Sequence, residues 1–135
     1  MKIFTSETQK IGEIGEEVAC KYLKNKGFLV IERNFTKKAG EIDIVATKEG
    51  KLHFFEVKSI SRETLDDNVS RETFRPEENM TFAKMKKLSR VTQIFLEQRK
   101  QFRDMDFFWN ILAIELNQNT RKARVRMIEK VNITE

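Results

Sequence analysis

Cysteine, proline, histidine, tryptophan and tyrosine are almost absent from this sequence. The single cysteine, Cys20, excludes an internal disulfide and fits a reducing compartment. No apolar run approaches the roughly 20 residues that a membrane-spanning helix requires. Residues 1–6 lack the long apolar region of a signal peptide. We therefore expect a cytoplasmic protein that does not enter a membrane.

Charged side chains, by contrast, are abundant. They make up 35% of the 135 residues, against 39% hydrophobic residues, and leave a formal net charge of +5. The length suffices for a single domain, residues 1–135, with its own core. The positive excess, with a pI near 9.4, favours polyanionic partners, although many ordinary soluble proteins carry a similar excess.

The hydrophobic pattern predicts an α/β chain in the order helix, three strands, helix, two strands. A capping box at Ser6-x-x-Gln9 begins the first helix, and Gly27 is suited to end it. The first helix carries an apolar stripe made of Ile11, Ile14, Val18, Tyr22 and Leu23. Three strands are expected next, at 28–32, 40–47 and 51–58, with a turn at 34–39.

The second half begins with a long irregular segment, 59–79, which holds the only proline. A helix at 81–101 and strands at 107–116 and 121–128 follow. The helix has an apolar stripe made of Phe82, Met85, Leu88, Val91 or Thr92, Phe95 and Leu96. A mixed sheet of about five strands with one helix on each face would bury both stripes.

Two of the predicted strands carry acidic residues within apolar surroundings. Side chains alternate along a strand, so Glu41, Asp43 and Val45 are expected on one face, and Ile42, Ile44 and Ala46 on the other. On the next strand, Glu56 and Lys58 share a face with Phe54. The stretch 48–50 between the strands is typical of a hairpin turn, which predicts that Asp43, Glu56 and Lys58 converge.

Such a convergence is costly unless a cation joins it. Two carboxylates about 4 Å apart repel by about 4 kcal/mol at an effective dielectric constant near 20. Lys58 can offset one charge, and a divalent cation such as Mg²⁺, which prefers oxygen ligands, would offset the rest. The alternative is an exposed strand face with scattered ion pairs, which contribute little to stability.

These motifs resemble those of a known group of nucleases. The pattern is similar to the PD-(D/E)XK superfamily and, within it, to the small bacterial YraN-like family of predicted endonucleases, relatives of the archaeal Holliday-junction resolvases. The residues that carry the resemblance are Gly12, Gly15-Glu16, Ala19, Tyr22-Leu23, Gly27, Arg33-Asn34, Gly40-Glu41-Ile42-Asp43 and Phe55-Glu56-Val57-Lys58, with a weaker match at Lys84, Leu88 and Leu96.

The resemblance implies a restriction-endonuclease-like core and a metal-dependent active site. Asp43 and Glu56 would bind Mg²⁺ or Mn²⁺, together with the carbonyl of Val57, and Glu16 would be a further ligand or position a water. Lys58 would orient the attacking water and stabilise negative charge at phosphorus. By analogy with the resolvases, a homodimer is possible.

The sequence departs from the family pattern at three places. Ile60 replaces an arginine that usually follows the motif lysine by two residues, Thr36 replaces a basic residue, and Asn110 replaces an aspartate. Each departure bears on substrate or partner contacts and leaves the implied metal ligands intact.

Several basic residues are candidates for nucleic-acid binding: Lys37, Lys38, Arg62, Lys84 and Lys87. A charged helix face is usually only solvated surface. The excess of positive charge on the second helix nevertheless favours contact with phosphates, which is independent of base sequence. The sole histidine, His53, lies on the opposite strand face from Glu56 by alternation, and we assign it to packing or solvent.

Three functions agree with these observations. The first is a metal-dependent endonuclease that cleaves DNA, including branched or structured DNA. The second is a non-catalytic nucleic-acid-binding module in DNA processing. The third is a protein-interaction domain that docks a partner through exposed aromatic residues in the stretch 74–76.

Overall fold

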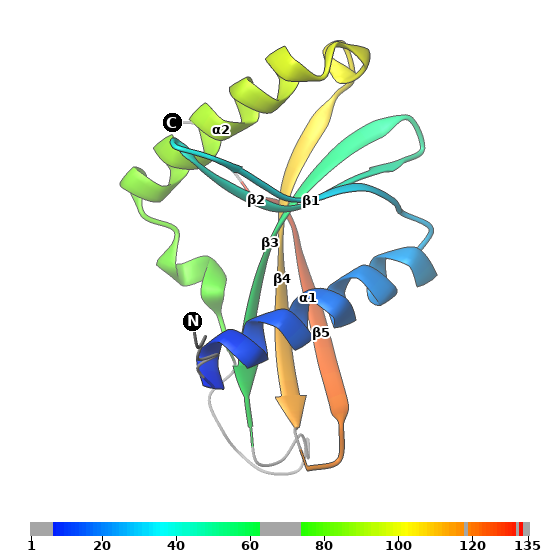
Figure 1. Ribbon diagram of the computed structural model, residues 1–135, viewed down its shortest axis with the longest axis vertical. Helices are drawn as coiled ribbons and strands as arrows, with labels where there is room; N and C mark the ends of the chain where they lie inside the picture. Colours follow the sequence, from blue (N-terminus) through cyan, green and yellow to red (C-terminus); the bar gives the residue numbers. More distant parts are fainter. Residues whose placement is uncertain (1–6, 63–73, 118, 132, 134–135) are drawn as a thin grey trace, which may run out of the picture.

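The computed structural model describes residues 7–62, 74–117, 119–131 and 133. These residues form two α-helices, two short 3₁₀ helices and five strands (Figure 1). In chain order they are α1 (Glu7–Asn25), β1 (Leu29–Lys37), β2 (Gly40–Lys48), β3 (Lys51–Ser61), η1 (Pro76–Asn79), α2 (Phe82–Gln98), η2 (Lys100–Phe102), β4 (Phe107–Asn117) and β5 (Lys122–Val131).

The strands form one mixed sheet in the order β1-β2-β3-β4-β5. All neighbours are antiparallel except β3 and β4, which are parallel. A parallel pair needs a long crossover connection, and α2 lies within that connection. The predicted αβββαββ order and mixed sheet are confirmed, and the arrangement agrees with a restriction-endonuclease-like core.

Helix α1 covers one face of the sheet. It buries Gly15, Ala19 and Leu23 against strand residues that include Phe55 and Leu112. The predicted apolar stripe of this helix is partly wrong, because one of its members, Ile14, is 46% exposed. Small residues bring the helix close to the strands: an added Cβ at Gly15 would lie 1.8 Å from Ser59 Oγ.

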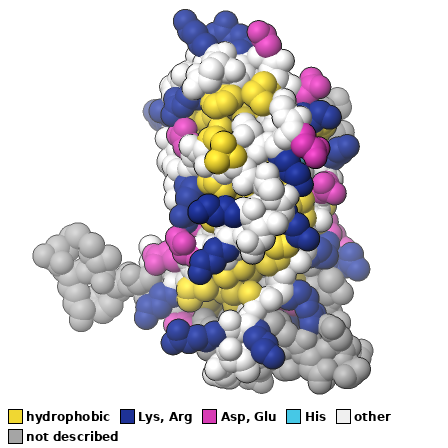
Figure 2. All heavy atoms as spheres, turned by 90° about the vertical axis from the view of Figure 1, so that its right-hand side faces the viewer, with side chains coloured by type: hydrophobic (Ala, Val, Ile, Leu, Met, Phe, Trp, Pro, Cys, Tyr) yellow, Lys and Arg dark blue, Asp and Glu magenta, His cyan; other side chains and the backbone are white. Residues whose placement is uncertain are grey.

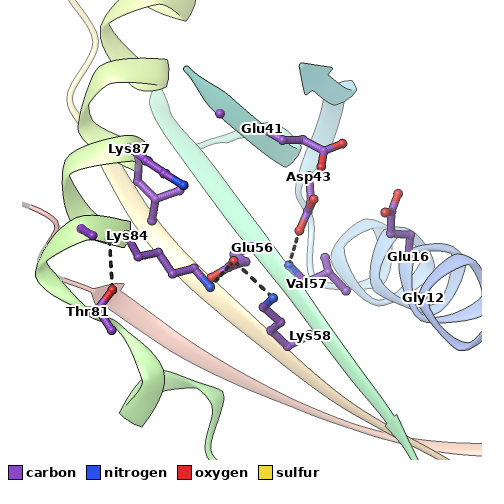
Figure 3. A pocket seen from close by; sticks show the side chains of 13 residues that line it. Gly12, Glu16, Glu41, Asp43, Glu56, Val57, Lys58, Thr81, Lys84 and Lys87 are labelled. Carbon is purple, nitrogen blue, oxygen red and sulfur yellow. Dashed lines mark hydrogen bonds and ion pairs between the residues drawn. The ribbon is translucent and has the colours of Figure 1, made fainter. Parts of the chain in front are cut away.

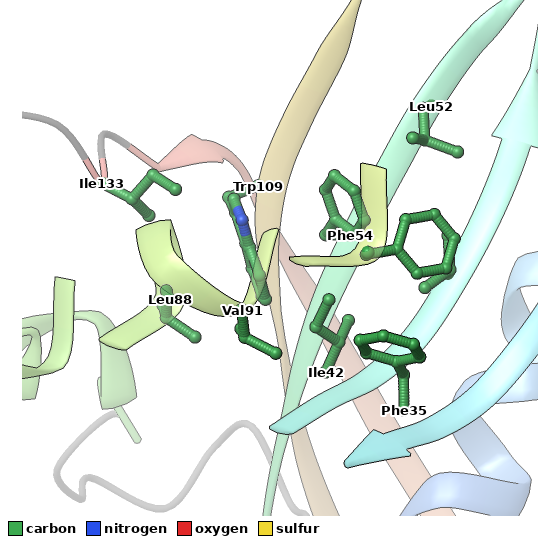
Figure 4. Close-up of a cluster of buried hydrophobic side chains, with 10 residues drawn as sticks. Phe35, Ile42, Leu52, Phe54, Leu88, Val91, Trp109 and Ile133 are labelled. Atoms are coloured by element: carbon green, nitrogen blue, oxygen red, sulfur yellow. The ribbon is translucent and has the colours of Figure 1, made fainter. Parts of the chain in front are cut away.

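Helix α2 packs on the opposite face through Leu88 and Val91 (Figure 4). Phe95, one turn further along the helix, is buried in the same cluster. Phe54 and Trp109 stack below the helix with ring centroids 5.4 Å apart. Both alternatives in the predicted stripe are buried: Val91 is apolar, and Thr92 accepts a hydrogen bond from Trp109 Nε1 at 2.8 Å. Phe82, which was also predicted to be buried, is 53% exposed at the first turn of the helix.

The ends of the elements differ from several predictions. The Schellman-type end of α1 is confirmed, because Phe28 N donates to Leu23 O and Gly27 has φ +91°. The predicted capping residue Ser6 lies outside the described residues. Strand β1 continues to Lys37, and pairing with β2 reduces the predicted turn at 34–39 to residues 38–39. Helix α2 ends at Gln98, before the short helix η2.

The predicted irregular segment 59–79 contains regular structure at both ends. Strand β3 extends to Ser61 because it continues to pair with β4. Pro76 is buried at the start of η1. Its ring is therefore not part of any exposed docking surface on the stretch 74–76. Residues 63–73 of this segment lie outside the described residues.

The β1–β2 pair separates from the sheet near the acidic residues. The β2–β3 ladder ends at Ile44 and Phe55, whereas β1 pairs with β2 as far as Gly40. Two-stranded ribbons twist more strongly than wide sheets, and this ribbon turns toward α2 (Figure 1). The predicted alternation is consequently wrong at one position: Ile42 packs in the cluster under α2, with Val45, and not with Ile44.

Two ion pairs hold the chain on either side of residues 63–73. Arg62 bonds Glu115 of β4, and its backbone N–H donates to Leu116 O. Arg126 of β5 bonds Glu77 of η1 at 2.9 Å and the carbonyl of Phe74. Both positions are therefore fixed on the β4–β5 pair.

Neither α-helix within the described ranges has the length and apolar content needed to cross a bilayer.

The contact between Gly15 and Ser59 yields a prediction about helix docking. Gly15→Ala should destabilise the protein by roughly 1–3 kcal/mol, because overpacking forces α1 away from β3. Denaturant unfolding measures this loss. The double variant Gly15→Ala/Ser59→Gly removes the clash and should recover part of the loss, although glycine weakens a strand. A single variant as stable as wild type would contradict the close packing.

Candidate active site

A pocket of about 540 Å³ opens between the two helices, where the β1–β2 ribbon leaves the sheet (Figure 3). Helix α1 contributes Gly12 and Glu16, and the first turns of α2 contribute the opposite wall. The floor comes from β2 and β3. Its lining residues are Gly12, Glu16, Gly40, Glu41, Asp43, Glu56, Val57, Lys58, Thr81, Ala83, Lys84, Lys87 and Leu88.

The predicted convergence of the two acidic strands is present. The ladder ends at Ile44 and Phe55, and the next residues on the two strands, Asp43 and Glu56, both line the pocket. At this point the backbone ladder is replaced by a side-chain contact: Val57 N donates to Asp43 Oδ2 at 2.7 Å. The carboxylate thereby holds the two strands together where their main chains part.

Asp43 is in an unfavourable environment for a negative charge. Burial, which is the largest cause, and the nearby carboxylates of Glu41, Glu16 and Glu56 together raise the pKa of its carboxyl from 3.8 to about 7. The hydrogen bond from Val57 opposes this shift without cancelling it. A cation at this position would relieve the desolvation and the repulsion together.

Glu56 is already neutralised by two lysines. Its side chain is only 15% exposed, and Oε1 lies 2.7 Å from Lys84 Nζ and 3.7 Å from Lys58 Nζ. Lys58 was predicted to share this strand face. Lys84 was predicted to bind nucleic acid, and its ion pair with Glu56 was not expected from the sequence.

Glu16 extends into the pocket from α1. Its Oε1 lies 3.7 Å from an amino group of Arg33, which also pairs with Glu17 at 3.0 Å. Sequence reasoning noted Arg33 only as part of a family pattern. Arg33 lies on β1 and pairs with Ile44 of β2, the strand that carries Asp43. This position beside β2 is the signal that could have identified it.

The donor set suits a hard divalent cation. Carboxylate oxygens of Asp43, Glu56 and Glu16 and the carbonyl of Val57 are the ligand types that Mg²⁺ and Mn²⁺ prefer. In the described part of the chain, however, no three His, Cys, Asp or Glu side chains lie close enough together to form a preassembled metal site. Binding of an ion would therefore require side-chain movement, and Glu56 would have to leave Lys84.

The predicted nucleic-acid contacts are divided between the pocket and other places. Lys84 and Lys87 line the α2 wall. Lys37 and Lys38 lie at the tip of the β1–β2 ribbon, whose Gly40 approaches Lys87 O and Val91 of α2. Arg62, by contrast, is paired with Glu115 and does not line the pocket.

Positive side chains also occur far from the pocket. The face shown in Figure 2 carries many Lys and Arg side chains around hydrophobic strips. Basic residues alone therefore do not mark the pocket; their combination with the partly buried carboxylates of Glu16, Asp43 and Glu56 does.

Two further residues prove to be structural. Asn110, one of the departures from the family pattern, is 1% exposed, and its side chain joins Phe54 O and Lys130 N on the neighbouring strands. Burial excludes a direct substrate contact there. His53 packs against Phe28 and Phe55 on the α1 side, as predicted from alternation, and its burial lowers its pKa.

Comparison with known proteins identifies several relatives. The family model described as "Uncharacterised protein family UPF0102" matches residues 15–128. A UPF0102 protein of Helicobacter pylori (strain HPAG1) is 39% identical over 99 residues, which cover 73% of this chain and 77% of the relative. UPF0102 proteins of Desulforamulus reducens and Clostridium botulinum are 32% and 30% identical and cover 91% and 88% of this chain, and 95% and 90% of their own lengths.

The raised pKa of Asp43 predicts how stability depends on pH. The folded protein retains a proton on Asp43 up to about pH 7, whereas the unfolded chain loses it near pH 3.8. The free energy of unfolding should therefore fall as pH rises between these values. Asp43→Asn removes this penalty and should stabilise the metal-free protein at pH 8 by on the order of 2 kcal/mol, with less gain at pH 5.

Urea unfolding in EDTA at both pH values tests this expectation. Glu97→Gln is the matched control, because Glu97 is an exposed acid of α2 outside the pocket. Equal effects of the two substitutions at pH 8 would show that the Asp43 environment is not unfavourable for charge.

Proposed function

The chain belongs to the uncharacterised protein family UPF0102, the YraN-like group, and we propose that it is a metal-dependent endonuclease that hydrolyses DNA. Family membership confirms the resemblance drawn from the sequence motifs and assigns no activity. The observation that carries the proposal is one pocket lined by Glu16, Asp43, Glu56 and Lys58 beside the lysines of α2.

Packing alone does not explain why the carboxylates of the pocket lie together, and we assign them to metal binding. Asp43, Glu56 and Glu16, with the Val57 carbonyl, would hold Mg²⁺ or Mn²⁺. When bound, the ion supplies a Lewis acid for the phosphoryl oxygen and an activated water. Lys58, whose side chain is 47% exposed, is free to turn from Glu56 toward a substrate, orient the attacking water and stabilise charge at phosphorus.

The α2 wall would bind the substrate backbone. Lys84 and Lys87 face the pocket from the first two turns of α2, and Lys37 and Lys38 lie on the ribbon that approaches the same helix. Contacts of lysine with phosphate position a nucleic acid without reading its bases. We therefore propose recognition of the DNA backbone or of DNA structure, including branched DNA, rather than of a base sequence.

A second candidate is a non-catalytic nucleic-acid-binding module. The observation that favours it is the ion pair of Glu56 with Lys84 and Lys58, which neutralises an implied ligand without any ion. Salt-sensitive DNA binding without turnover would support this function in place of the nuclease.

The nuclease predicts cleavage that depends on the pocket. Labelled linear, forked and four-way DNA should be cut in Mn²⁺, and Asp43→Asn, Glu56→Gln and Lys58→Met should each lower the rate by at least about 100-fold. Gel analysis of the products measures the rate. Glu97→Gln should cut as wild type does. Absence of cleavage of every DNA, or cleavage that survives Asp43→Asn, would exclude the proposal.

The substrate wall predicts the salt dependence of DNA binding. Lys87→Met should weaken binding and reduce the slope of log K against log salt concentration by about 0.9, the value for one phosphate contact. Lys122→Met is the matched control, because Lys122 begins β5 outside the pocket. Fluorescence anisotropy at several salt concentrations measures both slopes. Equal slopes for the two variants would place the DNA elsewhere.

A further inference from the structure

One oxygen of Glu56 receives two ammonium groups, and the two contacts are not equivalent. Lys84 Nζ lies 2.7 Å from Oε1, within hydrogen-bond distance, whereas Lys58 Nζ lies at 3.7 Å. The Lys84 side chain is 29% exposed and that of Lys58 47%. Lys84 is thus the shorter and better shielded partner of a carboxylate that is itself mostly buried.

The backbone of Lys84 is fixed in a position that directs its side chain into the pocket. Its N–H donates to the side chain of Thr81, the N-cap of α2, at 3.1 Å. One turn later, Leu88 anchors the helix in the core. Figure 3 shows the Lys84 side chain extending from this first turn across the pocket to Glu56. Only the flexible side chain, and not the helix, has to move to release the carboxylate.

A divalent ion on Glu56 and the ammonium of Lys84 cannot occupy the same oxygen. Both are positive, and their repulsion is weakly screened in a partly buried site. Asp43, in contrast, accepts a hydrogen bond from the backbone N–H of Val57. The two carboxylates on the pocket floor therefore differ: within the described part of the chain Asp43 forms no ion pair with a lysine, whereas Glu56 is paired with Lys84.

We propose that Lys84 occupies the metal-binding position of Glu56 until a nucleic-acid phosphate draws it away, so that metal and DNA bind cooperatively. A phosphate offers the ammonium a new acceptor on the open side of the pocket, and Glu56 is then released for the ion. Linkage makes the effect reciprocal: the ion also strengthens DNA binding. This inference rests on the proposed nuclease function, and Lys84 acts in it as a positioning residue.

The first test is the affinity for Mn²⁺ without DNA, measured by the electron paramagnetic resonance signal of free Mn²⁺ with the full chain. Lys84→Met should bind Mn²⁺ roughly tenfold more tightly than wild type, because one nearby positive charge is lost. Lys84→Arg keeps the charge and should behave as wild type. Lys86→Met is the matched control: it removes a lysine of the same helix that lies over Phe82 and outside the pocket.

The second test is the coupling between ion and DNA. Anisotropy of a labelled duplex is measured in EDTA and in Ca²⁺, with the products checked for cleavage. Ca²⁺ should tighten DNA binding in wild type and Lys86→Met, and tighten it several-fold less in Lys84→Met. Circular dichroism and melting temperature confirm that each variant is folded; Lys84→Gln serves as a second variant if Lys84→Met is not.

The outcomes separate the two proposals. If Mn²⁺ binds and DNA is cut, but Lys84→Met leaves the Mn²⁺ affinity unchanged or Lys86→Met changes it equally, the cooperative role of Lys84 is wrong and the nuclease stands. If wild type binds no Mn²⁺ in the presence or absence of DNA, and Glu56→Gln behaves identically, the nuclease itself is wrong.

Discussion

The hydrogen bond from the Val57 amide to the Asp43 carboxylate is the interaction on which the site depends. It lies where the β2–β3 ladder ends, and it replaces main-chain pairing by one side-chain contact. Without it, the two diverging strands would lose this link at the floor of the pocket. With it, the β1–β2 ribbon can turn toward α2 while Asp43 and Glu56 line the same pocket.

This arrangement places charge where the fold does not favour it. Asp43 is half-buried near other carboxylates and has its pKa raised to about 7, while Glu56 is held by two lysines. Unfavourable groups of this kind persist where a ligand or a reaction needs them. The surrounding framework is conventional in comparison: an apolar cluster on each sheet face, with α1 packed close through Gly15 and α2 anchored by Leu88.

Much of this framework follows from local sequence. Alternation along 40–47 and 51–58 and the hairpin turn sufficed to predict that Asp43 and Glu56 meet, because register follows from turn length. Alternation failed at Ile42, since the twist of a two-stranded ribbon depends on its separation from β3 and on its contact with α2. The exposure of Ile14 and Phe82 was also missed, because helical periodicity does not give the angle at which a helix lies on its sheet.

The partners of the charged residues were the least predictable part of the site. Lys84 is 28 positions from Glu56 in the chain, and Arg33 is 17 positions from Glu16; no local pattern pairs them. Asn110 looked like a lost functional residue and proved to be a buried link among three strands. Composition identified the types of residue needed for phosphate chemistry, but only the packing of α1, α2 and the ribbon determined which of them meet.

The ion pairs of Arg62 and Arg126 have a consequence for changes in the length of the chain. They attach the chain to β4 and β5 immediately before and after residues 63–73. Because both attachment points belong to one rigid strand pair, the entropy of closing the intervening stretch rises only slowly with its length. A change in the length of this stretch should therefore cost little stability and leave the candidate pocket undisturbed, because the pocket is lined by residues of α1, β2, β3 and the start of α2.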